Sequence, residues 1–527
     1  MSVQTSKYAT AWVVLDNPVF RRLWIGGVVM GIGQVIQELT ASWLMTTLTS
    51  NPLPVALLQT SLSLPVLLVA FPAGALADLL DRRKWMITVL AGLSLVSFAL
   101  AALSYNSLLT PEGLLAMIFL TGCLSAAFTP SWMRTVPDVL SGAQVPMGVT
   151  LHSTAVNLAR LGGASIAAFV LGNWFTGAGF LLTSGGCLFL AFAILRWRSP
   201  ASASGLPPEN FGAAIMTGMR YALHSPAVKR VSIRTLAFST FGSAMLALLP
   251  TLARRHWQVS AFEFGMLWAC FGLGAVLGAT LLVPLRQRFS LDALIGFMTG
   301  GLALLLFCIA RLETASFAFP LMCLAGTAWV SMVSTFGVSM GAASSPWVLS
   351  RMLSLYVLAF QGAAAIGSIL WGQLAQQFGA PLALSVASVA LASTIGLAFL
   401  APMPSPNPQQ LQPSHHWPEP PSASTIPVDA PVTVTVEYLI NPSGQADFRA
   451  AMNGLRSQRL RDGAIAWSLH QSIEEPQRFL ELFQLPSWLD HLRQHERVTI
   501  ADHGQQDLVQ QYHVGSNPPA VRHWTGL

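Results

Sequence analysis

Twelve long apolar segments follow one another between Leu23 and Leu400, and most are separated only by short polar stretches. A helix needs about 20 apolar residues to cross the hydrocarbon core of a bilayer, and each segment is close to that length. Charged residues make up 9% of this chain and hydrophobic residues 53%, whereas charged residues make up roughly a quarter of a soluble chain. The sequence therefore predicts a membrane protein that crosses the bilayer many times.

The predicted spans form two groups of six around a polar connector. The first group comprises residues 23–47, 55–77, 85–105, 113–129, 149–171 and 177–195. The second group comprises residues 231–252, 262–285, 291–310, 317–340, 352–374 and 380–400. We therefore expect an all-α membrane body, with an N-terminal six-helix bundle over residues 1–196, a connector over 197–230 and a C-terminal six-helix bundle over 231–401.

The positive charges predict how the chain is oriented in the membrane. Sixteen Lys and Arg residues flank the spans on one side, and three lie on the other side, namely Arg254, Arg255 and Arg311. Loops rich in Lys and Arg stay in the cytoplasm. Both termini and the connector are therefore expected to be cytoplasmic, with the protein in the inner membrane, and the Arg254–Arg255 pair is the one local exception.

The two groups of spans resemble each other. Identical residues recur at offsets of 200 or 204 positions, at Gly162 and Gly362, Gly172 and Gly372, Gly179 and Gly379, Gly74 and Gly278, and Arg82 and Arg286. Glycine is common in membrane helices, so chance is the alternative explanation. The matches fall at equivalent helices and favour a parallel duplication, in which the substrate pathway lies between two halves related by an axis along the membrane normal.

The composition becomes that of a soluble protein after residue 402, where 12 of the 22 acidic residues lie. Residues 402–431 are rich in Pro, Ser and Gln and are expected to form an extended or disordered linker. Residues 432–527 predict a small α+β domain, with strand, helix, strand, strand, helix and strand at 432–440, 444–461, 464–473, 478–485, 488–511 and 520–526. That order of elements is ferredoxin-like.

The loop between the second and third spans carries the sequence G-A-L-A-D-L-L-D-R-R-K, which begins at Gly74. Gly74 permits close approach of helices, and the partial positive charge of a helix N-terminus would favour the Asp78 carboxylate. Arg82 and Arg83 would pair with acids or with helix C-termini, in contacts that form in one state of a transporter and break in the other. The alternative is that the basic residues only set topology, which leaves the spacing of the Gly and Asp residues unexplained.

This loop resembles the signature of the major facilitator superfamily. Asp81 stands where many members have a second glycine, and in that respect the loop is similar to the subgroup of enterobactin-type siderophore exporters. Residues 20–24, 43–45, 76–78, 129–130, 136–138 and 157–160 are also similar to that subgroup. The C-terminal region resembles a soluble, monooxygenase-like domain that is appended to some of those transporters. The resemblance implies a secondary transporter with twelve helices that exports a small molecule by alternating access.

Polar side chains inside the spans are candidates for the substrate or proton pathway, because they are costly in lipid. They are Gln34, Gln37, Glu38, His152, Asn157, Arg160 and Gln361. The first three are spaced i, i+3 and i+4 and so share one helix face, as do Asn157 and Arg160. A Glu38–Arg160 pair across the central cavity would neutralise both charges, and protonation of Glu38 would release it. The alternative is that Glu38 lies near the outer interface and extends its carboxylate to water.

The remaining polar patterns predict no catalytic, metal or cofactor site. All five cysteines fall inside apolar spans without the spacing of metal ligands, so each is expected to be a small buried residue. His491 and His495 are spaced i, i+4 and would place two imidazoles on one helix face, but no further ligands are evident, so we expect that face to be solvated. The chain has no nucleotide motif, which disfavours an ATP-driven pump, and no basic stripe interleaved with aromatic residues, which disfavours nucleic acid.

The sequence therefore predicts a proton-coupled secondary exporter of small molecules, with a C-terminal domain that regulates or dimerises it, and no enzyme. Its expected partners are a small-molecule substrate, the lipid bilayer and a second copy of the C-terminal domain. One alternative is a transporter fused to a small enzyme that acts on the transported compound. Another is a membrane sensor that transports nothing, which would have no need of the Gly74, Asp78 and Arg82 motif.

Overall fold

The computed structural model describes residues 11–79, 81–140, 144–175, 177–197, 211–404, 410–414, 416–417, 427 and 429–525, except for the side chains of residues 11, 70–79, 146, 153, 211–215 and 283. This part of the chain contains 12 helices long and apolar enough to cross a membrane, which confirms the predicted body. The chain divides into two compact units. The first comprises Met1–Ser204, Arg234–Thr335 and Leu358–Leu400, and the second comprises Gly205–Ile233, Phe336–Val357 and Ala401–Leu527.

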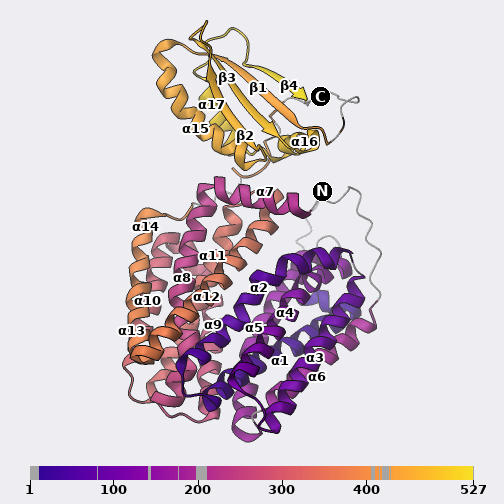
Figure 1. Ribbon diagram of the computed structural model, residues 1–527, viewed down its shortest axis with the longest axis vertical. Coiled ribbons are helices and arrows are strands. Elements are labelled where there is room, and N and C mark those ends of the chain that lie inside the picture. Colours follow the sequence, from indigo (N-terminus) through magenta and orange to yellow (C-terminus); the bar gives the residue numbers. More distant parts are fainter. Residues whose placement is uncertain are drawn as a thin grey trace, which may run out of the picture. The chain divides into compact units, whose positions relative to one another are not determined.

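Six helices form the N-terminal half of the first unit (Figure 1): α1 (Pro18–Leu48), α2 (Pro52–Leu79), α3 (Arg82–Tyr105), α4 (Pro111–Val139), α5 (Gln144–Asn173) and α6 (Ala178–Leu195). Polar caps fix where some of them begin. The Asn17 side chain accepts hydrogen bonds from the backbone N–H groups of Val19 and Phe20 at 2.9 and 3.2 Å, and so starts α1. Thr110 caps α4, and both helices have proline at their first position, where its missing N–H is not needed.

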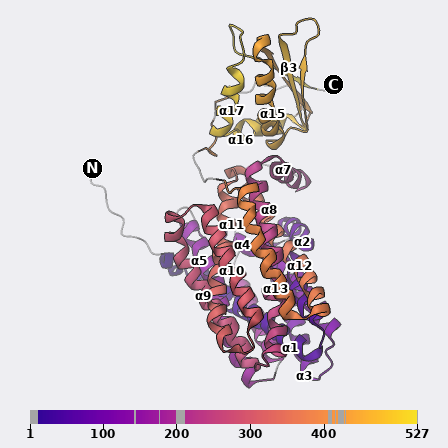
Figure 2. The same cartoon turned by 90° about the vertical axis from the view of Figure 1, so that its left-hand side faces the viewer.

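The C-terminal half consists of α8 (Pro226–Thr251), α9 (Ala261–Arg288), α10 (Leu291–Arg311), α11 (Ala318–Ala342), α12 (Leu349–Phe378) and α13 (Ala380–Ser393), which is followed by the short α14 (Leu397–Leu400). Ser260 begins α9 with a reciprocal cap: its hydroxyl accepts from the Glu263 N–H at 3.2 Å, and the Glu263 carboxylate accepts from the Ser260 N–H at 2.7 Å. α10 and α13 pack side by side (Figure 2).

Within the first half, α1, α3 and α6 pack around an apolar core. Met86, Leu90, Leu190 and Ile194 are fully buried there. The five cysteines are free, and only Cys187, in this core, is fully buried; the other four are half-buried. The expectation that every cysteine is buried therefore holds in full for one of them.

Glycines let the two halves approach closely. A Cβ atom at Gly172 in α5 would lie 2.8 Å from the Cβ atom of Phe262 in α9, and a Cβ atom at Gly372 in α12 would lie 2.7 Å from that of Ala56 in α2. The Thr60 hydroxyl in α2 also donates to the Ala365 carbonyl in α12 at 3.1 Å. In both contacts the fifth helix of one half meets the second helix of the other, as a parallel duplication requires.

The C-terminal domain is a four-stranded antiparallel sheet with helices on one face, which confirms the predicted α+β domain. Its strands are β1 (Val432–Leu439), β2 (Ala466–Gln471), β3 (Arg478–Leu485) and β4 (Ala520–Thr525), in the order β2-β3-β1-β4. Its helices are α15 (Gln445–Arg461), α16 (Trp488–Arg497) and α17 (Ile500–Gln510). Alternate residues of β1 are buried, because only one face of the sheet lies against the apolar core.

Two features of this domain differ from expectation. The helix predicted over residues 488–511 is two helices, because Thr499 starts a new one: its hydroxyl accepts from the Asp502 N–H, and the Asp502 carboxylate accepts from the Thr499 N–H at 2.9 Å. The expected linker is also partly ordered. The Ser414 N–H donates to the Val498 carbonyl at 2.9 Å, and the Trp417 indole N–H donates to the Gln506 side chain at 2.8 Å.

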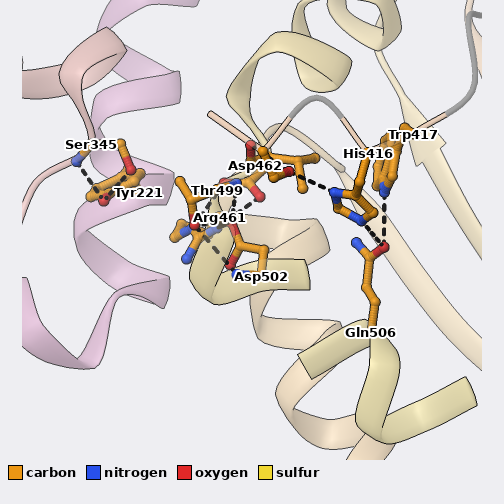
Figure 3. A network of polar contacts seen from close by, with 11 residues as sticks. Tyr221, Ser345, His416, Trp417, Arg461, Asp462, Thr499, Asp502 and Gln506 are labelled. Atoms are coloured by element: carbon orange, nitrogen blue, oxygen red, sulfur yellow. Dashed lines mark hydrogen bonds and ion pairs between the residues drawn. The ribbon is translucent and has the colours of Figure 1, made fainter. Parts of the chain in front are cut away.

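The expected connector contains a helix, α7 (Phe211–His224), which lies in the same unit as the C-terminal domain. Tyr221 of α7 is 1% exposed, and its hydroxyl lies 3.1 Å from that of Ser345 (Figure 3). The Arg461 guanidinium of α15 lies 5.7 Å from the Tyr221 ring and is held by the Asp462 and Asp502 carboxylates at 2.8 and 2.6 Å. α7 is therefore packed against the C-terminal domain through a buried aromatic and cationic contact.

Candidate functional site

The basic loop between α2 and α3 is bound to the ends of two other helices of its half. Arg82 forms an ion pair with Asp138 near the end of α4, and both side chains are largely buried, at 15% and 21% exposed. Arg83 donates a hydrogen bond to the Leu195 carbonyl at the end of α6. Both cations thus lie at helix C-termini, where the helix dipole favours positive charge. The sequence did not predict a role for Asp138, which lies beyond the fourth predicted span but in the last turn of α4.

The acids of the loop have different roles. The Asp81 side chain accepts a hydrogen bond from the Lys84 N–H at 3.0 Å and so caps the N-terminus of α3. A glycine at this position would leave α3 without that cap. The side chains of Gly74 and Asp78 lie outside the described residues, so their expected contacts remain predictions.

The equivalent arginine of the second half makes an equivalent contact. Arg286, at the end of α9, donates to the Thr335 hydroxyl of α11 at 3.1 Å and lies 3.5 Å from the Ser334 hydroxyl. α11 is the fourth helix of its half, as α4 is of the first. The two halves therefore place an arginine in the same way, but among the described residues only Arg82 meets a carboxylate there.

The second half has a buried ion pair elsewhere, which sequence analysis also missed. Arg234 of α8 pairs with Asp292 in the first turn of α10, and the arginine side chain is 3% exposed. A cation this deeply buried depends on its partner, because burial removes its hydration.

The polar residues of the first span do not share one environment. The Gln37 side chain is buried and accepts a hydrogen bond from the Ser97 hydroxyl of α3 at 2.7 Å. Gln34 is exposed, and its amide donates to the Ser125 hydroxyl of α4 at 3.2 Å. Gln37 thus joins helices within the first half, whereas Gln34 remains accessible.

Glu38 and Arg160 are brought within electrostatic reach of each other, from α1 and α5. Within the described part of the chain they form no direct ion pair. Glu38 is half-buried and Arg160 is exposed. The two charges therefore attract each other without being fixed together, and their place in a transport pathway remains a prediction.

The other pathway candidates lie on the fifth helix of each half: His152 and Asn157 on α5, and Gln361 on α12. His152 is half-buried, with its ring 6.2 Å from that of Trp132 in α4. Asn157 and Gln361 are half-buried on α5 and α12. No hydrogen bond among the described residues joins either of them to Glu38 or Arg160, so their part in a common pathway remains a prediction.

Arg254 and Arg255, the expected exception to the charge distribution, connect the two halves at one end of the first unit. The Arg254 guanidinium lies 4.9 Å from the Trp43 ring, and Arg255 donates to the Thr49 carbonyl at 3.4 Å. Trp43 also packs against Phe264 of α9, with ring centroids 5.3 Å apart. The short π-helix Leu252–His256, which directly follows α8, thus binds the end of α1 through its positive charges.

The solvation expected for His491 and His495 is wrong. His491 is 1% exposed, His495 is half-buried, and their Nε2 atoms lie 3.3 Å apart. Their helix, α16, packs its histidine face against the sheet, because Trp488 on the same face belongs to the apolar core. In the described part of the chain no group of three or more His, Cys, Asp or Glu side chains is arranged to hold a metal ion.

Two duplicated six-helix halves, joined through their second and fifth helices and carrying charged side chains between them, define a transporter of the major facilitator type. The sequence profile described as transmembrane secretion effector matches residues 9–526, and the chain belongs to this family. The match includes the C-terminal domain.

Individual relatives are exporters and transporters of siderophores. The chain is 29% identical over 349 residues to the enterobactin exporter EntS of Salmonella choleraesuis (strain SC-B67), a match that covers 62% of this chain and 78% of the relative. It is 25% identical over 260 residues to the staphyloferrin A transporter of Staphylococcus aureus (strain NCTC 8325 / PS 47), covering 48% of this chain and 64%, just under two thirds, of the relative.

Solved structures show the same fold. A bacterial homolog to the human lysosomal transporter Spinster, in an inward-facing and occupied conformation, matches with a TM-score of 0.59 at 15% identity over 73% of this chain and 96% of its own. The nucleoside transporter NupG matches with a TM-score of 0.55 at 12% identity over 72% of this chain and 99% of its own.

Proposed function

We propose that this protein is a secondary active exporter that moves a siderophore-type small molecule out of the cytoplasm by alternating access, driven by the proton gradient. The observation that carries the proposal is the glycine-lined contact between the halves, at Gly172 and Gly372, where the fifth helix of each meets the second helix of the other. Helices that meet through glycines pack closely, and such packed halves can separate and close as rigid bodies. The siderophore class comes from the named activities of the two relatives.

Proton coupling is assigned to Glu38. Its carboxylate lies in α1 within electrostatic reach of Arg160, so its protonation removes an attraction between two helices of the pathway. A charge inside a membrane span is costly, which makes an acid without a direct ion-pair partner unusual unless it has a function. Gln34 is the accessible neighbour through which a polar substrate would be bound.

The orientation follows from the distribution of Lys and Arg, with both termini in the cytoplasm of the inner membrane. In this orientation the Arg82–Asp138 pair lies on the cytoplasmic side, and the contact of Arg254 with Trp43 closes the outer side. These two contacts support the proposal of a state whose pathway opens to the cytoplasm, from which an exporter collects its substrate.

Transport in proteoliposomes tests the proposal. The full chain is reconstituted, a pH gradient is imposed, and accumulation of iron-free enterobactin or staphyloferrin A is measured with and without a protonophore. We expect uphill accumulation that the protonophore abolishes. If neither compound moves and neither dissipates the pH gradient, the siderophore class and the coupling are both wrong.

A further inference from the structure

The C-terminal domain encloses a cavity of about 450 Å³ between its sheet and its covering helices. Its walls are mainly apolar and come from Val434 and Val436 of β1, Phe483 of β3 and Leu455 of α15. This volume lies in the range of small-molecule sites, which are concave and mostly apolar with a few convergent polar groups. A fully packed domain of this size would have no such void.

Three imidazoles form the polar end of the cavity. His491 and His495 of α16 and His523 of β4 all line it, and the His491 ring lies 4.8 Å from each of the other two rings, measured between centroids. The Nδ1 atom of His491 is buried without a hydrogen bond of normal geometry. A buried polar atom left in this way is costly unless a ligand or water satisfies it.

The histidines are neutral at physiological pH. Burial, followed by the neighbouring imidazoles, lowers the pKa of His491 to about 3, and burial lowers the pKa of His495 to about 4. A neutral imidazole has one N–H donor and one acceptor nitrogen. The cluster therefore offers both donors and acceptors to a hydroxyl or carboxylate group.

A cation also lines the cavity, at Arg459. Arg459 of α15 donates from Nε to the Glu481 carboxylate at 3.1 Å, and its guanidinium lies 4.6 and 5.1 Å from the rings of Phe483 and Trp417. Glu481 also accepts from the Tyr438 hydroxyl at 3.0 Å, so this carboxylate is already satisfied within the domain. The outer nitrogens of Arg459 are the donors that suit an anionic or phenolic oxygen.

The mouth of the cavity is formed in part by the segment that precedes the domain. Trp417 and His416 both reach the Gln506 side chain of α17, at 2.8 and 2.9 Å (Figure 3). Both residues line the cavity, so the segment before β1 completes the site.

We propose that this cavity binds a planar aromatic molecule that carries hydroxyl or carboxylate groups, with its ring against the apolar strand residues and its oxygens at His495 and Arg459. The aromatic class follows from the apolar and aromatic walls, and the oxygens follow from the neutral imidazoles and the guanidinium. The site belongs to the C-terminal domain alone and is independent of the transport pathway.

Calorimetric titration of the full chain in nanodiscs tests this site, with 2-naphthoate as the probe and cyclohexanecarboxylate as a non-planar acid of similar charge. Empty nanodiscs correct for partition into lipid. We expect saturable binding of 2-naphthoate in the micromolar range and at least tenfold weaker binding of cyclohexanecarboxylate. Absence of saturable 2-naphthoate binding, or equal binding of both acids, would overturn the proposal.

Two matched pairs of variants assign the binding to the cavity. His495→Leu removes an imidazole at the cavity, whereas His470→Leu removes an exposed one on β2. Val434→Trp fills the cavity, whereas Thr433→Trp adds the same volume on the other face of β1. We expect the first member of each pair to weaken 2-naphthoate binding at least tenfold and the second to leave it unchanged. If Val434→Trp does not fold, the histidine pair decides alone, and equal affinities in that pair refute the site.

Discussion

Arg82, at the first position of α3, forms an ion pair with Asp138 near the end of α4. The pair ties the basic loop to the fourth helix of its half, and Arg286 contacts the fourth helix of the other half through the Thr335 hydroxyl. In both halves an arginine thus contacts the fourth helix, but its partner is a carboxylate in the first half and a hydroxyl in the second. An ion pair responds to charge and to solvation more strongly than a hydroxyl contact does, so of these two contacts the one at Arg82 would change more in energy with a change of state.

Loss of the Asp138 charge should slow transport. Asp138→Asn leaves Arg82 largely buried without its counter-charge, which costs about 1–2 kcal/mol in a site that water still reaches in part. We expect transport in proteoliposomes to fall about tenfold while the protein still inserts. Glu112→Gln, at the exposed opposite end of α4, is the matched control and should change little. Equal rates for the two variants would show that the pair has no part in switching.

The proton coupling assigned to Glu38 predicts a specific defect. Glu38→Gln keeps the size of the side chain but cannot release a proton, so transport should no longer depend on the pH gradient, although downhill movement continues. Arg160→Ala should impair transport more than Leu158→Ala, because Leu158 is an exposed apolar residue of the same helix. Flux is measured with and without a pH gradient. Full uphill transport by Glu38→Gln would mean that the proton enters elsewhere.

The glycine contact between the halves predicts a steric effect. Gly372→Ala places a Cβ atom 2.7 Å from that of Ala56, so α12 and α2 must move apart, at a cost of about 1–3 kcal/mol to the joined state. We expect a melting temperature several degrees lower and slower transport. Gly185→Ala is the control, because a Cβ atom there meets nothing within 4 Å. A Gly372→Ala protein as stable and active as the control would contradict the close contact.

The histidine cluster predicts how the stability of the C-terminal domain varies with pH. In the folded domain the pKa of His491 is about 3, below its ordinary value of 6.5, so the unfolded chain binds more protons between these values. Stability is therefore complete above about pH 6.5 and falls toward pH 4, by at most about 1.4 kcal/mol per pH unit for this residue. The free energy of opening of α16, obtained from hydrogen exchange after correction for the intrinsic pH dependence of amide exchange, should decrease from pH 7 to pH 5. His491→Phe should weaken that dependence, and His470→Leu should not.

Self-association through the C-terminal domain remains a prediction. All helices of the domain lie on one face of its sheet, and the other face carries Leu480 and Trp524, which are 36% and 54% exposed. We expect the full chain in detergent to form dimers by light scattering and Leu480→Lys to shift it to monomers, since a buried lysine opposes pairing. A monomeric wild-type protein would exclude this role.

The sequence determined the elements of this protein because each depends on local properties. Span length and hydropathy predict the twelve helices whatever their packing, and alternation and charge predict the strands and helices of the C-terminal domain. The loop that includes Arg82 and Arg83 was also evident, because its residues are close together in the chain. The break between α16 and α17 was not predicted, although the Thr499–Asp502 capping box is a local signal.

Only the tertiary structure decided which residues meet. Asp138 pairs with Arg82, which lies 56 residues earlier in the sequence, and Arg254 contacts Trp43 of the other half. Both contacts depend on how the helices pack. The Gln37 side chain accepts a hydrogen bond from Ser97 of α3, although the sequence spacing predicted that it shares one helix face with Gln34 and Glu38. The same holds for His491, whose polar character predicts exposure to solvent. Its helix packs against the sheet, and this packing buries the imidazole in the wall of a cavity. The spacing of residues along one helix does not reveal such packing.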